Sequence, residues 1–387
     1  MEIIATTKVT NRDGIKAIKN GQKFNKFSDI PTPKKPSWLK VKAEFNPNFH
    51  KVKEQVQSKQ LYTVCEEAHC PNISECWSAG TATFMLMGSV CTRACKFCSV
   101  DTGNPNGWLD KDEPINTAKA VEIMKLKYVV LTSVNRDDLL DGGAQHFADT
   151  VKLIKELNPN TAVEALTPDF KGLSSSIDTL VNCGLEVFAQ NIETVERLTH
   201  QVRDIRAGYK QTLDVLAESK RINPRVLTKT SIILGLGETD IEIENTMDDL
   251  IKNKVDILTI GQYLRPTRNH HPIERWVTPE ETLNDFKKFL TLVKNEFGTI
   301  KVYMIGIKPS VDRLYLDEEE RVFNNSISFL AKEDPYLEYI NVWDLMLNED
   351  GTRMPDLYVE DGLHMNPKGY EIWTQLVRES LNKDFNL

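Results

Sequence analysis

Short apolar runs alternate with amphipathic helical stretches along much of the chain. Six runs have the length and composition of strands: 83–88, 128–134, 162–168, 185–193, 227–237 and 255–264. Between most of them, apolar residues recur three and four positions apart, as in GGAQHFADTVKLIKEL. The residues of that stretch that would face a core are Phe147, Val151, Leu153 and Ile154. Repeated strand–helix alternation predicts an α/β fold, a parallel sheet wrapped by helices. Six units suit a partial TIM-like barrel or an open doubly wound sheet.

Polar residues and glycines follow the predicted strands, where both kinds of sheet place their sites. They are Asn135, Asp137, Asp138, Gly142, Gly143, Thr167, Asn191, Glu193, Glu238 and Arg265. We therefore expect the functional site at the carboxyl ends of the strands.

Two flanking regions differ in pattern from this core of residues 61–277. Residues 1–60 are polar and contain DIPTPKKPSW, so we expect an extended arm with little core of its own. Residues 278–387 predict a further α/β segment. Its first helix has Thr278 as N-cap and Glu281 at the capping-box position.

Composition narrows the class of protein. The 387 residues carry 48 basic and 56 acidic side chains, and this net charge of -8 does not suggest a nucleic-acid binder. Residues 1–60 are the exception, with thirteen basic and five acidic residues; they would form a solvated arm or contact an acidic partner. We find no secretory signal and no apolar run that could span a membrane, so we expect a cytoplasmic protein.

Six of the seven cysteines form two triads. The first is Cys65-x4-Cys70-x5-Cys76, and the second is Cys91-x3-Cys95-x2-Cys98. Such clustering in a chain without an export signal favours metal over disulfides. Three thiolates on a four-iron cluster leave one iron open for a ligand. Zinc and buried thiols are the alternatives, but zinc usually prefers paired C-x2-C knuckles, which both triads lack.

The remaining cysteine and the nearby histidines fit structural roles better. Cys183 lies on an apolar pattern and is expected in the core. His69, inside the first triad, would be a solvated loop residue or a competing ligand. His270 and His271 precede Pro272 and are expected to be loop residues.

The second triad, with Phe97 before its last cysteine, resembles the signature of radical S-adenosylmethionine (SAM) enzymes. Together with KKPSWLKVK, CEEAHCPNISECW, TSVNRDDLLDGGAQHF, NIETV, LGLGET and GQYLRPTRNHHPIERW, it is similar to the lipoyl synthase family over about residues 34–281. The resemblance implies a partial (β/α)6 radical SAM barrel with an N-terminal cysteine-bearing extension.

The resemblance also implies the chemistry. Cys91, Cys95 and Cys98 would hold a radical-generating [4Fe-4S] cluster, and Cys65, Cys70 and Cys76 an auxiliary [4Fe-4S] cluster that serves as sulfur source. S-adenosyl-L-methionine would supply a 5′-deoxyadenosyl radical. Sulfur would be inserted at C6 and C8 of an octanoyl chain on the lysine of a carrier, such as a lipoyl domain or the glycine cleavage H protein. Flavodoxin or ferredoxin would donate electrons.

Further site residues follow from the resemblance, most of them with a structural alternative. Gly142 and Gly143 would approach the methionyl end of SAM or form a strand–helix turn. Asn191 and Glu193 would bind ribose hydroxyls or be inert loop residues. Gly235, Gly237 and Glu238 would contact the adenine side. Arg206 and Arg265 would pair with polar substrate groups or make structural ion pairs.

The family pattern ends near Thr278. The Arg-Ser-Ser motif that supplies the last auxiliary ligand in that family does not occur after Glu280; Ser310, Ser326, Ser328 and Ser380 lie in other contexts. The tail, especially DGLHMNPKGYEIW, instead resembles the C-terminal part of an SGNH (GDSL-type) hydrolase. That resemblance implies that Asp361 and His364 would be triad partners. The sequence has no Gly-Asp-Ser element to supply the nucleophile, so we expect a structural fragment and no esterase.

Overall fold

The computed structural model describes residues 7–21, 29–36, 39, 46–70, 72–78, 81–359 and 362–385. The chain forms two compact units, one that runs to Trp276 and one that begins at Val277. None of the helices in the described ranges combines the length and apolar character that crossing a membrane requires.

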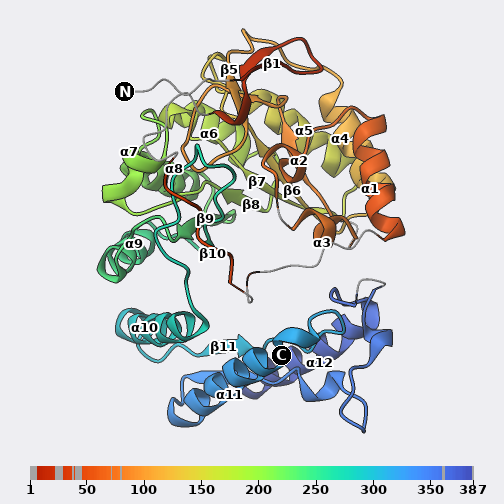
Figure 1. Ribbon diagram of the computed structural model, residues 1–387, viewed down its shortest axis with the longest axis vertical. Helices are drawn as coiled ribbons and strands as arrows, with labels where there is room; N and C mark the ends of the chain where they lie inside the picture. The colour runs from red at the N-terminus through yellow and green to blue at the C-terminus, as the bar shows by residue number, and fades with distance from the viewer. Residues whose placement is uncertain are drawn as a thin grey trace. The chain divides into compact units, whose positions relative to one another are not determined.

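A six-stranded parallel sheet forms the centre of the first unit (Figure 1). Its strands are β3 (Thr83–Leu86), β6 (Tyr128–Ser133), β7 (Ala162–Leu166), β8 (Val187–Ala189), β9 (Leu227–Leu234) and β10 (Ile257–Gln262). All six predicted strands are confirmed, and their order in the sheet follows the order of the chain. A doubly wound sheet reverses its strand order at a switch point. The sequential order therefore selects the partial barrel between the two predicted architectures.

Helices connect the strands as the amphipathic patterns predicted. They are α4 (Glu113–Met124), α5 (Ala144–Leu157), α6 (Ser174–Val181), α7 (Thr199–Val202), α8 (Tyr209–Ile222) and α9 (Asp240–Lys252). In α5, the side chains of Phe147, Val151 and Ile154 are fully buried, while Leu153 is partly buried. Cys183 belongs to the same apolar core, which confirms the prediction for this residue.

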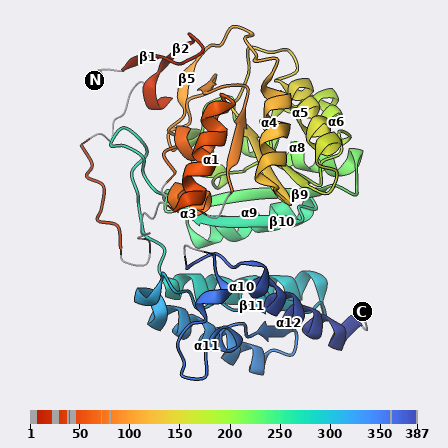
Figure 2. The ribbon, with the colours of Figure 1, turned by 90° about the vertical axis from the view of Figure 1, so that its right-hand side faces the viewer.

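Part of the predicted extended arm is folded. Strands β1 (Lys8–Thr10) and β2 (Lys16–Ile18) join β5 (Asp101–Gly103) and β4 (Val90–Cys91) in a second sheet, of order β1-β2-β5-β4 (Figure 2). Helix α1 (Pro47–Ser58) buries Phe49, Val52 and Val56 in the main core. These three residues are spaced three and four positions apart, which is the spacing of one helix face. The rest of the predicted arm, at 1–6, 22–28, 37–38 and 40–45, lies outside the described residues.

The second unit is α/β, as the sequence predicted. Its elements are α10 (Pro279–Phe297), β11 (Val302–Ile305), α11 (Asp317–Glu333), β12 (Leu337–Ile340) and α12 (Pro367–Phe385). The predicted capping box is present, since Thr278 Oγ1 accepts from Glu281 N at 3.1 Å. Strands β11 and β12 pair in parallel, with α11 between them in sequence. A small core of Met346, Leu357, Tyr358 and Met365 lies next to the last helix.

Candidate active site

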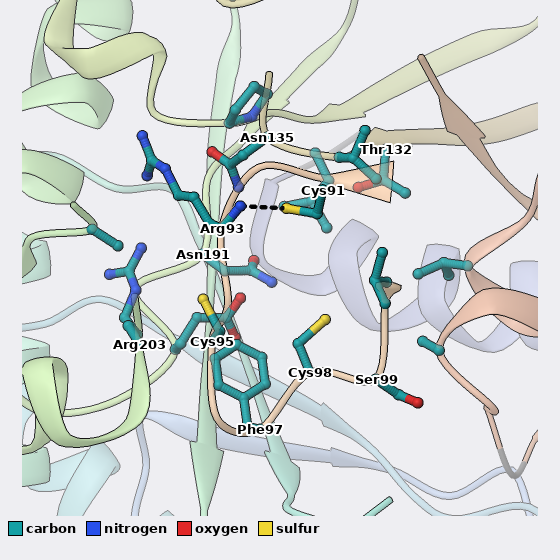
Figure 3. Close-up of a pocket in the computed structure, with 18 of the residues that line it drawn as sticks. Cys91, Arg93, Cys95, Phe97, Cys98, Ser99, Thr132, Asn135, Asn191 and Arg203 are labelled. Atoms are coloured by element: carbon teal, nitrogen blue, oxygen red, sulfur yellow. Dashed lines mark hydrogen bonds between the residues drawn. The ribbon is translucent and has the colours of Figure 1, made fainter. Parts of the chain in front are cut away.

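A cavity of about 470 Å³ lies at the carboxyl ends of the six parallel strands. Every strand contributes residues from its end or from the segment that follows: Met85, Thr132–Asn135, Leu166–Asp169, Gln190, Asn191, Glu193, Ile233 and Gly261–Leu264. The predicted position of the site is therefore correct. Cys91, Cys95 and Cys98 also line this cavity, and in Figure 3 their sulfur atoms face the same space.

The thiols of the second triad are buried deeply enough to stay protonated when no metal is bound. Burial, and then the neighbouring Cys91, raise the pKa of Cys95 to about 12. The pKa of Cys98 is raised by burial and then by Cys95. Two backbone amides already donate to these sulfurs: Arg93 N to Cys91 Sγ at 3.4 Å and Asp204 N to Cys95 Sγ at 3.3 Å. Such amides would stabilise thiolates on a cluster and tune its reduction potential.

Distant segments hold the loop that carries the second triad. Lys96 N donates to Val202 O at 2.7 Å, and Lys96 O accepts from His271 N at 2.9 Å. His270 Nε2 lies 3.0 Å from Cys98 O. His270 and His271 do lie between regular elements, as predicted, but both are buried, and they position the cysteine loop.

Arg93, inside the second triad, is the centre of a buried ion-pair network. Its guanidinium lies 2.9 Å from Asp137 and 2.6 Å from Asp169, at the ends of β6 and β7. Arg206 extends the network through Asp137, at 3.2 Å, and Asp204, at 2.8 Å. Because a buried charge needs a partner, these contacts tie the cysteine loop to two strand ends.

A group of polar side chains faces the cavity from the end of β8. Glu193 has a left-handed backbone (φ 67°), which is strained for a residue other than glycine. Burial raises the pKa of the Glu193 carboxyl group. The nearby Arg203 and a hydrogen bond from Asn191 act in the opposite direction, but the net shift is upward. Gln190 Oε1 is buried and has no hydrogen-bond partner among the described residues. Polar atoms of these side chains are therefore available to hydrogen-bond a ligand in the cavity.

The other predicted cofactor-binding residues do not line this cavity. Gly142 and Gly143, which precede α5, make room for Phe170 and Met87. Gly235 and Gly237 have positive φ, and Glu238 accepts from the amides of Gly235 (2.6 Å) and Leu236 (2.9 Å), so Glu238 closes its own loop.

The two predicted arginines have structural partners. Arg206 pairs with Asp204 and Asp137, as described above. Arg265 donates to the carbonyls of Ile30, Arg268 and His270. Instead, Arg203 reaches the cavity, held by Ile192 O and Thr212 Oγ1, both at 3.1 Å. The sequence patterns did not identify Arg203 or Arg93 as site residues, although the position of Arg93 between Cys91 and Cys95 was an available signal.

The first triad lies beside the same cavity. Cys65 is on α2 (Val64–Glu67), and its helix neighbours Val64 and Ala68 line the cavity. Cys76 is on α3 (Ile73–Ser78), and its pKa is raised to about 11 by burial and then by Cys65 and Cys70. His69 is exposed, as predicted, and its Nδ1 lies 2.7 Å from Ser99 Oγ, which joins the two cysteine loops.

The donor set of the triads is compatible with iron–sulfur clusters. None of the six triad cysteines forms a disulfide. Among the described residues, no three His, Cys, Asp or Glu side chains are arranged to hold one metal ion. A zinc ion would need its ligands within about 2.3 Å, whereas a four-iron cluster takes each thiolate on a different iron. Three thiols per site, none of them in a disulfide, are compatible with such a cluster.

The predicted hydrolase pair is only partly described. His364 is half-buried, and its carbonyl accepts from Val359 N at 2.8 Å. Asp361 lies outside the described residues.

Comparisons with family models identify two regions of the chain, and both matches belong to the radical SAM family. Residues 85–250 match the radical SAM superfamily, and residues 7–70 match the N-terminal domain of lipoyl synthase of the radical SAM family. The second match begins well before residue 34, where the sequence resemblance was expected to start.

Individual relatives agree with these matches. A lipoyl synthase of Legionella pneumophila (strain Corby) is 63% identical over 308 residues, which covers 80% of this chain and 93% of the relative. One of Ectopseudomonas mendocina (strain ymp) is 62% identical over 275 residues, covering 71% and 79%. Among solved structures, the FeFe-hydrogenase maturase HydG from Carboxydothermus hydrogenoformans has a TM-score of 0.45 at 11% identity, covering 76% of this chain and 65% of that chain. That likeness is too distant to add to the fold argument.

Proposed function

The chain belongs to the lipoyl synthase family of radical SAM enzymes, and from this premise we propose that its cavity is where two sulfur atoms are inserted at C6 and C8 of a protein-bound octanoyl group. The observation that carries this proposal is the position of the two triads. Cys91, Cys95 and Cys98 line the cavity, and the neighbours of Cys65 line it too.

The radical SAM family implies a [4Fe-4S] cluster and SAM. We assign Cys91, Cys95 and Cys98 to that cluster and Cys65, Cys70 and Cys76 to a second, auxiliary [4Fe-4S] cluster. When bound, these groups would supply the electron that cleaves SAM and the sulfur that enters the product. The protein's own part is to hold the thiols, orient the substrates and exclude water.

Glu193, Asn191 and Gln190 are the candidates for binding SAM. A carboxylate beside Arg203 can accept hydrogen bonds from ribose hydroxyls, and the amide groups of Asn191 and Gln190 can both donate and accept. These residues face the cavity that the second triad lines. Gly142, Gly143, Gly235 and Glu238, away from the cavity, would act by shaping the backbone around it.

The remaining wall is mostly apolar and suits an octanoyl chain. Its side chains include Val64, Met85, Val100, Val134, Leu166, Ile233 and Leu264. An unactivated C–H bond offers no acid or base a point of attack, so only a reactive radical breaks it. A dry wall protects that radical from side reactions until sulfur is transferred.

The substrate would be an octanoylated carrier protein, with flavodoxin or ferredoxin as electron donor. The test is anaerobic incubation of the reconstituted full-length protein with reductant, SAM and an octanoylated lipoyl domain. Mass spectrometry should find two added sulfur atoms on the carrier, together with 5′-deoxyadenosine.

The same assay distinguishes the alternative function. Deoxyadenosine without added sulfur would mean that the protein cleaves SAM but cannot complete insertion, as expected if nothing replaces the missing Arg-Ser-Ser serine. Absence of both products would refute the radical function. The hydrolase resemblance of residues 278–387 remains a prediction without a nucleophile, and a serine-reactive probe should leave the protein unlabelled.

A further inference from the structure

Two apolar side chains are unusually exposed beside the cavity. Leu140 is 99% exposed and Ile205 is 76% exposed, the highest values among the large hydrophobic residues of the described chain. Full exposure of a leucine has no stabilising effect in an isolated protein, because its apolar surface stays in water. Leu140 is in the loop after β6, and Ile205 is in the segment between α7 and α8.

Hydrogen bonds connect these two loops at one rim of the cavity. Arg206, next to Ile205, pairs with Asp137, three residues before Leu140. Lys171 Nζ donates to Asp137 O at 3.1 Å, and Phe170 packs against Gly142. Leu140, Lys171, Ile205 and Arg206 are all exposed and surround the Asp137 loop; we call these four residues the rim patch.

The rim patch is continuous with the wall of the cavity. Ile205 lies between Arg203 and Ala207, which both line the cavity, and Lys171 follows Asp169, which also lines it. Anything that inserts a long side chain into the cavity from this rim must therefore cover the patch.

We propose that the rim patch is the docking surface for the folded carrier domain whose octanoyl-lysine enters the cavity. This inference rests on the proposed function, since the occupant is the carrier of that reaction. Leu140 and Ile205 would contact apolar side chains next to the modified lysine, and the ammonium group of Lys171 would face acidic groups around them. A partly apolar patch with cations at its edge is typical of a protein interface.

The test compares two substrates in two double variants of the full-length protein. The variant is Leu140→Asp with Ile205→Asp. The matched control is Ile123→Asp with Leu157→Asp, two exposed residues at the last turns of α4 and α5, at the opposite end of the sheet. The substrates are an octanoylated lipoyl domain and a short octanoyl-lysine peptide cut from the same domain.

We expect the rim variant to raise KM for the intact domain by about tenfold or more, with kcat and the peptide reaction unchanged. The control should resemble the wild type with both substrates. A domain KM within about twofold of the wild type, or an equal loss with the peptide, would overturn the proposal.

A binding measurement keeps the inference independent of turnover. Calorimetric titration of the wild type with the octanoylated domain should show binding, and the rim variant should bind the same domain with about tenfold lower affinity. The milder changes Leu140→Ser and Ile205→Ser should each reduce it less. If the wild type binds the domain but forms no product, the proposed function fails while the docking surface stands. If the wild type and rim variant bind equally, the docking surface is refuted.

Discussion

Arg93 and Asp169 form a buried ion pair, with Nη1 2.6 Å from Oδ2 and Nη2 2.8 Å from Oδ1. The bond joins the loop of the second cysteine triad to the end of β7. The other edge of the same guanidinium binds Asp137 at the end of β6. The geometry of the cysteine loop therefore depends on one arginine that contacts two strands.

Replacing Arg93 should lower the stability of the folded protein substantially. Arg93→Leu leaves the buried carboxylate of Asp169 without its charged partner and removes one of the two arginines that contact Asp137, and we expect a loss of about 3 kcal/mol in the free energy of unfolding. Urea denaturation of the full-length protein measures it. The control is Arg197→Leu, which removes a half-exposed pair with Glu242 and should cost less than about 1 kcal/mol. Equal effects of the two changes would contradict the assigned role of Arg93.

The iron content of the protein should depend on the triad cysteines and should not depend on Cys183. We expect Cys95→Ala and Cys76→Ala each to lose about one four-iron cluster from the reconstituted protein. Cys183→Ala should keep the full iron content, because Cys183 lies in the apolar core. Iron and sulfide analysis measures the difference, and zinc in place of iron would reject the cluster assignment.

The Gly143 position should tolerate no methyl group. Its φ of 88° is left-handed, and a Cβ there would overlap Met87 Sδ. Gly143→Ala should therefore lose both backbone and packing energy, about 3 kcal/mol in total. Gly172 has a similar φ of 72°, but a methyl group there would meet no heavy atom of the described residues within 4 Å, so Gly172→Ala should lose only about 1 kcal/mol. Chemical denaturation of both variants separates the packing contribution from the backbone contribution.

The second unit should lose stability as the pH rises. Burial raises the pKa of Glu320 from 4.5 to about 7, and its Oε2 has no hydrogen-bond partner among the described residues. A pKa that is higher in the folded state favours the protonated form, so its stabilising effect is complete below pH 4.5 and disappears as the pH rises through 7. At about pH 8, Glu320→Gln should be more stable than the wild type by about 2 kcal/mol, and at about pH 4.5 the two should be equal.

The control for this pH dependence is Glu319→Gln on the same helix. Glu319 is exposed, so its removal should leave the difference between the two pH values as in the wild type. Hydrogen exchange in α11 at both pH values reports on this unit specifically. A Glu320→Gln variant that parallels the wild type at both values would show that the carboxyl is ionised without penalty.

The strands and most helices were predictable because a parallel sheet buries continuous apolar runs, and such runs are visible in one dimension. The position of the cavity was then predictable from the carboxyl ends of those strands, and metal binding was predictable from the two cysteine triads. The partners of Arg93 were not predictable, because Asp137 and Asp169 reach it only after three segments meet. Similarly, nothing local distinguished Glu238, which closes its own loop, from Glu193, which faces the cavity.

The contacts that His270 and His271 make with the cysteine loop can form only late in the synthesis of the chain. His270 Nε2 contacts Cys98 O across 172 positions of sequence, and His271 N binds Lys96 O. Synthesis proceeds from the N-terminus, so the cysteines leave the ribosome long before these histidines. A nascent chain that ends before residue 270 presents the second triad on a loop that lacks both contacts. Both contacts to the cysteine loop can therefore form only after residue 271 has been synthesised, close to the end of the first unit at Trp276.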